Sequence, residues 1–426
     1  MEIIGSIDRS KLRAESERNG IPILDLLMKK LKSYSRNKDE DFTIFAACPN
    51  SFNVIKAALR AAKRAKAPII FAATLNQVDI DRGYTGWKPE DLVRIIKEES
   101  YRIGYRGPVI IAIDHGGPWV KDIQFTEKWD SGRAMEWTKK SFEAAILAGY
   151  DLIHVDPTVD IFVDDIKIET VVERTIELIY YAEVFRKKNH RLPISYEVGT
   201  EEVKGGFADI ETFKKFLTLM KKGLAEKGIS YAWPLFIVGK VGTDLHTTEF
   251  SAAIAGELVK IAGEHNSYLK GHYTDFVVNP EDYPRVGVGA ANVGPEFTML
   301  EYDGFIELSN IENDLYKMNK IAKKSDFKKI LENAVIKSNR WKKWLRNDEK
   351  DLDSISPERK ELIIETSCRY VWAVPAVRVA KYELYKNLYD NGFDPENWIL
   401  LKIEEGMDKY FRAFNLINLN EKLGLS

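Results

Sequence analysis

The chain has 426 residues, 45% of them hydrophobic, which is enough for one large domain with an appendage or for two to three ordinary domains. Its 63 basic residues nearly balance its 65 acidic ones, so its net charge gives no reason to expect a nucleic acid or an anionic membrane as partner. The charged fraction of 30%, with Lys, Glu and Ile prominent, leans towards a thermophilic source.

The cysteines and the N-terminal residues indicate which structural classes and cellular locations to expect. Cys48 and Cys368 are far apart and lack CxxC spacing, so neither a disulfide framework nor a cysteine zinc site is expected. Residues 1–9 lack the basic start and apolar stretch of a signal peptide, and no later run approaches the ~18 apolar residues that span a bilayer. We therefore expect a cytoplasmic protein with no membrane partner.

From residue 43 onward, short apolar runs alternate with segments of helical periodicity. The strand-like runs cover residues 43–48, 68–74, 109–114, 152–156, 193–198, 235–239, 268–271 and 286–289. Eight such runs predict an α/β fold, a (β/α)8 TIM barrel. A doubly wound open sheet is the rival, but no run is followed by GxGxxG. Only residues 273–285 separate the last two runs, which predicts a rudimentary seventh helix.

The flanks of the barrel are expected to be helical. We predict a helical lead-in over residues 1–40, the barrel over 41–320 and a helical C-terminal subdomain over 321–426. The later helices are expected at residues 311–321, 327–345, 357–368, 376–388 and 398–416. Trp341 and Trp344 are interpreted as packing anchors, and the basic run around them as a solvated helix face rather than a nucleic-acid patch.

The third run ends in Asp114-His115-Gly116-Gly117-Pro118. An acid and a base at the end of a buried strand must be hydrogen-bonded, metal-bound or solvated, although a strand-ending turn with an Asx hydrogen bond is an alternative explanation. Residues at the carboxyl ends of barrel strands converge on one mouth. The polar residues expected at this mouth are Cys48, Asn76, Gln77, Asp114, His115, His154, Asp156, Glu197, Glu201, Lys240, His272, Asp275 and Asn292.

Histidine is scarce, and three of the six histidines (His115, His154 and His272) fall at predicted strand ends. Imidazole and carboxylate groups from different strands suit a divalent metal ion such as Zn, Mn, Co or Fe. The expected ligands are His115, Glu197 and His272, with His246 or Glu201 as a further or substitute ligand. The alternative for each histidine is a hydrogen-bonded residue at the rim of the barrel.

Five blocks of sequence resemble a known family in order and over roughly residues 40 to 300. The blocks are Leu75-Asn76-Gln77-Val78 with Gly83-Tyr84-Thr85-Gly86, Asp114-His115-Gly116-Gly117-Pro118, His154-Val155-Asp156, Val198-Gly199-Thr200-Glu201 and His272-Tyr273-Thr274-Asp275. They are similar to those of the non-catalytic subunit of class II tagatose-1,6-bisphosphate aldolase. A weaker similarity follows at Arg369-Tyr370-Val371-Trp372.

Two departures from that pattern bear on function. The seventh helix is shortened, and Glu197 stands where the resemblance implies an apolar residue. The block Tyr196-Glu197-Val198-Gly199-Thr200-Glu201 is instead similar to the metal-dependent C4 epimerases of tagaturonate and tagatose. The resemblance thus implies ketohexose chemistry at C4, on free or phosphorylated fructose and tagatose, and leaves the reaction open.

The mechanism expected for C4 inversion follows from the acidity of the carbon. The C4 hydrogen is not acidic, so inversion needs either transient oxidation, for which no nucleotide fingerprint is present, or retro-aldol cleavage between C3 and C4. A metal ion would stabilise the enediolate. Asp114 or Asp156 is expected to shuttle the C4 hydroxyl proton, with Glu201 or Asp275 as partner acid or base.

Substrate contacts are expected from Asn76, Gln77, Lys240 and Asn292. For a phosphorylated substrate, we expect backbone amides near residues 287–294, with Lys240 or Arg285, to hold the phosphate.

Three functions compete. The first is a metal-dependent ketohexose 4-epimerase, the second a class II-type tagatose-1,6-bisphosphate aldolase, and the third an accessory subunit of a separate aldolase chain. The expected partners are a ketohexose or its phosphate, and either further copies of this chain or an aldolase subunit. The ring of ionisable residues favours catalysis, because a scaffold does not need such groups at a barrel mouth.

Overall fold

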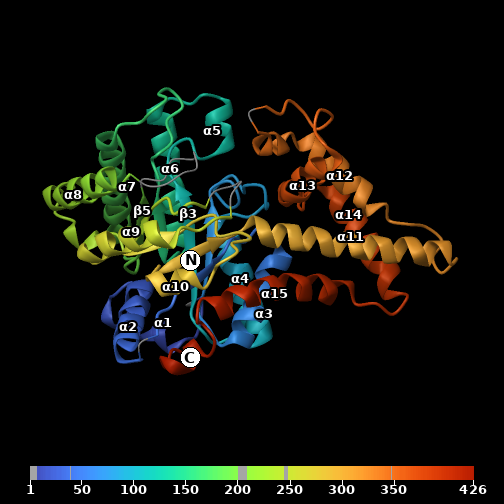
Figure 1. Cartoon of the computed structure of the whole chain (residues 1–426), viewed down its shortest axis with the longest axis horizontal. Coiled ribbons are helices and arrows are strands. Elements are labelled where there is room, and N and C mark those ends of the chain that lie inside the picture. Colours follow the sequence, from blue (N-terminus) through green and yellow to red (C-terminus); the bar gives the residue numbers. More distant parts are fainter. Residues whose placement is uncertain (1–6, 39, 200–208, 244–247, 347) are drawn as a thin grey trace.

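Eight parallel strands form a closed barrel in sequence order, and the pairing of β1 with β8 closes it (Figure 1). The computed structural model describes residues 7–38, 40–199, 209–243, 248–346 and 348–426. The strands are β1 Ile44–Ala47, β2 Ile69–Thr74, β3 Val109–Gly116, β4 Leu152–Val155, β5 Ser195–Gly199, β6 Phe236–Val238, β7 Tyr268–Gly271 and β8 Ala290–Val293. The predicted (β/α)8 fold is confirmed.

Helices surround this barrel and continue beyond it (Figure 1). The helices are α1 Lys11–Asn19, α2 Ile23–Lys38, α3 Phe52–Ala65, α4 Pro89–Ile103, α5 Asp122–Thr126, α6 Ser131–Ala148, α7 Ile168–Lys188, α8 Ile210–Glu226, α9 Ala252–Glu264, α10 Asp282–Val286, α11 Pro295–Lys317, α12 Phe327–Ser338, α13 Pro357–Ser367, α14 Pro375–Tyr389, α15 Pro395–Ala413 and α16 Leu419–Lys422. Short 3-10 turns lie at η1 Ser230–Ala232, η2 Arg340–Trp344 and η3 Cys368–Tyr370. The five residues of α10 confirm the rudimentary seventh helix. Within the described ranges, no helix is long and apolar enough to cross a membrane.

Local chemistry sets the ends of the barrel helices. The Ser51 hydroxyl accepts a hydrogen bond from the Val54 N–H and so caps the start of α3. Asp130 caps α6 through the Arg133 N–H in the same way. Gly149 then ends α6 with a φ of 92°, a left-handed conformation that glycine adopts without steric cost. The chain can therefore turn directly into β4.

The eighth strand lies later in the sequence than residues 286–289, so that part of the prediction is wrong. Val286 is the last residue of α10, and Gly287 ends the helix with a φ of 89°. Strand β8 begins at Ala290, opposite Ile44 of β1. Ala290 and Ala291 lack the β-branched side chains typical of strands, which is why the apolar pattern does not mark them.

Two predicted helices in the C-terminal part also differ from the structure. The helix expected at 311–321 begins at Pro295, directly after β8, and runs for 23 residues as α11. The helix expected at 327–345 ends at Ser338, because Asn339 takes a left-handed conformation with a φ of 56°. Asparagine tolerates this conformation better than most residues. The chain continues as the separate turn η2, in which Trp341 and Trp344 are both buried.

The C-terminal helices are anchored on the barrel. Helix α15 packs beside α3 and α11, and α12, α13 and α14 lie together beyond them (Figure 1). The Phe45 ring of β1 stacks on Tyr410 of α15 with 5.7 Å between ring centroids. Past α15, the Asn418 N–H donates to the Ala65 carbonyl oxygen at 2.8 Å. The end of the chain thus returns to the face of the barrel where the strands begin.

A buried ionic network stabilises the face of the barrel where the strands begin. The Arg13 guanidinium of α1 lies between the carboxylates of Asp8 and Asp151 and donates to the Val109 carbonyl oxygen at 2.7 Å. Asp8 also accepts the Val109 N–H at 3.0 Å, and Asp151 accepts the Ile111 N–H at 3.2 Å. The network therefore fixes the start of β3, the strand that ends at Asp114.

We predict that Arg13→Gln lowers the free energy of unfolding by about 3–5 kcal/mol, because it leaves two buried carboxylates without their cation. Urea unfolding followed by circular dichroism measures this change. Arg18→Gln, at the exposed end of the same helix, is the matched control and should change the free energy by less than about 0.5 kcal/mol. Equal effects of the two substitutions would contradict the structural role of Arg13.

Candidate functional site

The carboxyl end of β3 has an irregular backbone that positions His115. The pairing of β3 with β4 shifts register between Ile113 and Gly116, and His115 has a φ of 50°, in the left-handed region. Such irregularities re-aim side chains at the rims of barrels and next to active sites. Here the backbone irregularity gives Asp114 and His115 their positions beside the ends of neighbouring strands.

The glycine after this irregularity is required by a close approach of two backbones. A Cβ atom on Gly117 would lie 1.8 Å from the carbonyl oxygen of Asp156, a distance that no real side chain can adopt. The carbonyl oxygen of Gly116 accepts the Asp156 N–H at 2.9 Å. The two glycines therefore let the end of β3 lie against the residue that follows β4.

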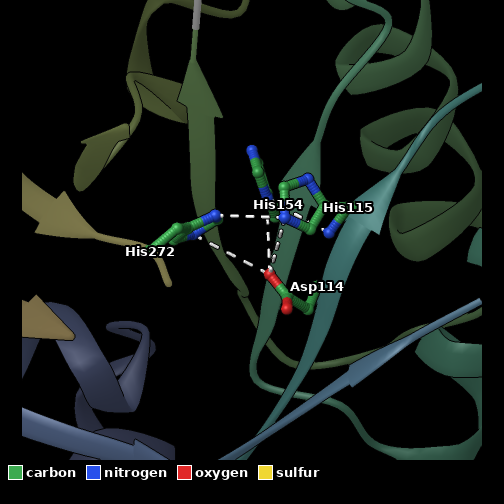
Figure 2. A group of neighbouring side chains, drawn as sticks. All are labelled: Asp114, His115, His154 and His272. Atoms are coloured by element: carbon green, nitrogen blue, oxygen red, sulfur yellow. Dashed lines mark hydrogen bonds and ion pairs between the residues drawn. The ribbon is translucent and has the colours of Figure 1, made fainter. Parts of the chain in front are cut away.

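Asp114, His115, His154 and His272 form a cluster whose potential ligand atoms all lie within 4.8 Å of one another (Figure 2). Asp114 Oδ1 is its centre. This oxygen lies 3.9 Å from His115 Nε2, 3.7 Å from His154 Nδ1 and 3.8 Å from His272 Nε2. The four residues come from β3, from β4 and from the end of β7.

This donor set fits a divalent metal ion. Two ligands that are each ~2.1 Å from one ion in a tetrahedral arrangement lie ~3.4 Å apart, slightly closer than the distances to Asp114 Oδ1. His154 Nδ1 already accepts the backbone N–H of His115 at 3.1 Å. His272 Nε2 is likewise engaged, by Glu197, but the other ring nitrogen of His272, Nδ1, lies 3.1 Å from His115 Nε2. Asp114, His115 and His272 are therefore the stronger candidates, and two histidines with one carboxylate suit Zn or Fe.

Glu197 lies directly behind His272. Its Oε1 is 2.8 Å from His272 Nε2, and its Oε2 is 2.6 Å from the Lys270 ammonium nitrogen. Burial opposes ionisation, but the charge of Lys270 and the neighbouring histidines lower the pKa of Glu197 to about 2. Both oxygens of Glu197 thus have partners and Glu197 lies outside the four-residue cluster, so its role as a metal ligand stays a prediction.

Asp156 orients His115 in a comparable way. Its Oδ2 lies 2.6 Å from His115 Nδ1, and its Oδ1 accepts the Thr158 hydroxyl. Burial opposes its ionisation, but the hydrogen bond and charge of His115 hold the pKa of Asp156 below its usual range. Asp156 is buried and lies outside the walls of the neighbouring cavity, so a positioning role fits it better than proton transfer to substrate.

A cavity of about 170 Å³ opens beside the cluster. Among the residues predicted from sequence, those that line it are Cys48, Asn76, Gln77, Asp114, His115, His272, Asp275 and Asn292. Lys240 follows β6 and does not line the cavity. Glu201 and His246 lie outside the described residues, so their predicted roles stay predictions.

The amide side chains predicted from sequence to contact the substrate have different partners in the cavity wall. Asn76 is bonded to the backbone of Val120 and Asp122, and Gln77 to Asn50 and the Thr74 N–H. These two side chains therefore hold the loop after β2 in place. Asn292 instead donates to Asp114 Oδ1 at 3.0 Å and so touches the centre of the cluster.

Asp275 is the cavity carboxyl whose acidity is weakened. Its Oδ1 accepts the backbone N–H groups of Gly294 at 2.9 Å and Glu296 at 2.8 Å. Burial nevertheless dominates, and the nearby Glu296 carboxylate adds to it, so the pKa of Asp275 is raised to about 7. A carboxyl group with this pKa can donate or accept a proton near neutral pH.

Sequence reasoning missed four basic residues of this region. Lys270 is fully buried on β7, and a lysine inside the short apolar run 268–271 was a usable signal for an inward-facing charge. Arg340, Lys343 and Arg369 line the cavity from the C-terminal part of the chain. The similarity at residues 369–372 pointed to Arg369, but no local pattern placed it near the barrel mouth.

We predict that the purified chain, after chelation, binds about one Zn²⁺ or Mn²⁺ ion in isothermal titration calorimetry. Changes to residues that only orient ligands cost about 10–100-fold in affinity, so His272→Gln should cost at least about a hundredfold. His190→Gln, at the exposed end of α7, is the control and should bind as the parent chain does. Undiminished affinity in His272→Gln would contradict the site.

The affinity of the cluster for the metal ion should also depend on pH. Burial lowers the pKa of His115, but the charge of Asp114 and the hydrogen bond to Asp156 outweigh burial and raise it above its usual value. A metal ion must displace this proton. The affinity measured in the same titration should therefore fall as the pH is lowered from 8 to 6.

Comparisons with known proteins agree with the fold and identify relatives. The probable tagatose 6 phosphate kinase of Sinorhizobium meliloti 1021 superimposes with a TM-score of 0.72 at 21% identity, over 87% of this chain and 100% of that one. The fructose-bisphosphate aldolase of Campylobacter jejuni gives a TM-score of 0.50 at 14% identity, over 93% and 95% of the two chains. At such low sequence identities, these two comparisons support a shared fold and nothing more.

Sequence comparison identifies relatives that align with most of the chain. The D-tagatose-1,6-bisphosphate aldolase subunit GatZ of Escherichia coli O7:K1 is 26% identical over 330 residues, 72% of this chain and 76% of the relative. The same subunit of Escherichia coli O6:H1 is 25% identical over 372 residues, 82% of this chain and 85% of the relative. The model of the family "D-tagatose-1,6-bisphosphate aldolase subunit GatZ/KbaZ-like" matches residues 28–413. The chain therefore belongs to the GatZ/KbaZ-like family.

Proposed function

We propose that the chain is a metal-dependent ketohexose 4-epimerase that interconverts fructose and tagatose, free or phosphorylated, by breaking and re-forming the C3–C4 bond. The observation that carries the proposal is the convergence of Asp114, His115 and His272 beside a cavity that also contains Asp275. Buried ionisable groups are costly to desolvate, and their concentration at a barrel mouth is typical of catalytic sites.

The chain's own residues would hold the metal and keep its ligands in place. Asp114, His115 and His272 would bind the ion, with His154 as a fourth neighbour. Bound there, a divalent ion would act as a Lewis acid for the negative charge that develops on the substrate oxygens when the C3–C4 bond breaks. Glu197 and Asp156 fix the ring orientations of His272 and His115 through hydrogen bonds.

The two carboxyl groups that line the cavity differ in their ability to transfer protons. Asp114 is ionised, because the charges of His115 and His272 outweigh burial and hold its pKa well below the usual range. Asp275, in contrast, is protonated below pH 7. Asp275, whose pKa lies near neutral pH, can therefore accept the C4 hydroxyl proton in its ionised form and return the same proton to the C4 oxygen after the aldehyde has turned its other face, which restores its starting state. Asp114 stays ionised throughout, as a ligand of the metal ion would.

We predict that kcat for tagatose formation rises as the pH rises through about 7, because Asp275 must be ionised to accept the C4 hydroxyl proton. Asp275→Asn should lower kcat by about a hundredfold and abolish this limb of the kcat–pH profile. The amide oxygen can still accept the Gly294 and Glu296 N–H groups, so the loop geometry is preserved. Persistence of the limb in the variant would exclude Asp275 as the group that accepts and returns the C4 hydroxyl proton.

A second candidate function is supported by the comparisons. The relatives are named subunits of D-tagatose-1,6-bisphosphate aldolase, and aldolase and epimerase differ only in whether the cleaved fragments escape or recombine. The chain would then cleave tagatose 1,6-bisphosphate itself or assist a separate aldolase chain. An accessory role alone leaves the buried cluster without a purpose, which is why we place a catalytic function first.

The deciding experiment incubates the chain, chelated and then with metal restored, with fructose, tagatose, their 6-phosphates and tagatose 1,6-bisphosphate. Chromatography follows both hexose epimers, and a coupled assay follows triose release. Metal-restored epimer exchange without triose is the expected result. Triose release identifies an aldolase, and inactivity on every substrate favours the accessory subunit.

A further inference from the structure

Three cations from the C-terminal part of the chain form one wall of the cavity beside the cluster. They are Arg340 and Lys343 of η2 and Arg369 of η3, here called the basic wall. The left-handed turn at Asn339 ends α12 and starts the turn that carries the first two. The run around Trp341 is therefore not simply a solvated helix face, as its sequence suggested.

The positive charge of the basic wall is only partly neutralised. Asp122 of α5 forms ion pairs with both Arg340 and Lys343. In the described part of the chain, no carboxylate lies within 4.0 Å of the Arg369 guanidinium, and its Nε is buried without a hydrogen-bond partner. Three cations and one carboxylate give the wall itself a net charge of about +2, which a bound anion would stabilise. Asp275, in the same cavity, offsets part of this charge only when it is ionised.

Two tyrosines hold the wall in shape. The Arg340 guanidinium lies over the rings of Tyr84 and Tyr370, 5.2 and 4.6 Å from their centroids, and the two rings pack edge to face. Arg369 donates to the Tyr370 hydroxyl at 3.1 Å. Burial raises the pKa of Tyr370, but the charges of Arg369, Lys343 and Arg340 outweigh it and leave the pKa below its usual value. The three cations therefore favour negative charge at the Tyr370 hydroxyl.

The cations expected from the sequence to hold a phosphate lie elsewhere. Arg285 is exposed, forms an ion pair with Asp282 and does not line the cavity, and neither does Lys240. Gly294 does line it, but its N–H donates to Asp275. The cavity therefore has its carboxylates and histidines on the barrel side and its cations on the C-terminal side.

We propose that the basic wall binds the phosphate group of a ketohexose monophosphate whose reacting carbons lie against Asp114, His115 and His272. The cavity reaches both groups of residues, so one extended ligand can contact them together. A phosphate monoester carries a charge of about −1.5 to −2 at pH 7 and matches the net charge of the wall, whereas a carboxylate would leave about one positive charge uncompensated. The proposal rests on the proposed function for the sugar but can be tested without turnover.

The test measures binding of fructose 6-phosphate, inorganic phosphate and fructose to the metal-loaded full chain by isothermal titration calorimetry. We expect the dissociation constant of fructose 6-phosphate to rise about tenfold in Lys343→Gln and about a hundredfold in Arg369→Gln, because each loses a charge-assisted hydrogen bond to the phosphate. Inorganic phosphate should follow the same order, and the affinity for fructose should not change. Arg285→Gln removes a cation outside the cavity and should bind all three as the parent chain does.

Thermal unfolding of each variant shows whether it is folded, and the partly exposed Lys343 provides a variant that leaves the core untouched if Arg369→Gln does not fold. Unchanged affinity for fructose 6-phosphate in folded Lys343→Gln and Arg340→Gln, or equal affinity of the parent chain for fructose and its 6-phosphate, would overturn the proposal. Wall-dependent binding without epimerisation would instead refute the proposed function and keep the phosphate site. If the chain epimerises free fructose and substitutions in the basic wall do not change the affinity for fructose 6-phosphate, the proposed function stands and the phosphate site is refuted.

Discussion

A single carboxylate oxygen, Asp114 Oδ1, lies within 4 Å of three imidazole rings in the interior of the barrel mouth. A charge this deeply buried is tolerated only where positive or hydrogen-bonding groups surround it. The same requirement applies to the neighbouring carboxylates. The negative charge of Glu197 is compensated by Lys270, and that of Asp156 by His115. The mouth is thus one connected arrangement of charges in which each side chain limits the positions of its neighbours.

The backbone that presents these groups is itself under constraint. His115 has a left-handed conformation at an irregular strand end, and Gly117 sits where no side chain fits. Conformations of this kind persist only when the surrounding structure enforces them. At the opposite end of β3, the Arg13 network fixes the start of the same strand, so ionic contacts hold both ends of β3 in place.

How far the sequence predicts this structure depends on how local each signal is. The β-branched run before Asp114 marks β3, and the alternation of such runs with helical periods predicts the barrel, because both patterns are encoded within a few residues. Strand β8 was misplaced because Ala290 and Ala291 carry little strand signal. Asp114, His115 and His272 were predicted to meet, since strand ends converge in any barrel.

Other features depend on contacts between distant segments. Whether Glu197 faces a metal or Lys270 depends on a side chain two strands away, which no spacing in the sequence reveals. The placement of Arg340 beside Tyr84 depends on how the C-terminal helices pack on the barrel, and a basic run alone does not encode that packing. The site was therefore predictable where strand topology sets it and unpredictable where side-chain pairing across the fold decides.

The separation of the cavity into a barrel side and a C-terminal side has an evolutionary consequence. Residues on the strands are tied into a rigid, mutually dependent charge arrangement, and most changes there would disturb the chemistry. The turn after Asn339 is short and lies outside the barrel, and it contributes its side chains without belonging to any strand. Descendants of a duplicated gene could diverge in the ligands they accept through this turn alone, while inheriting the charge arrangement of the barrel mouth unaltered.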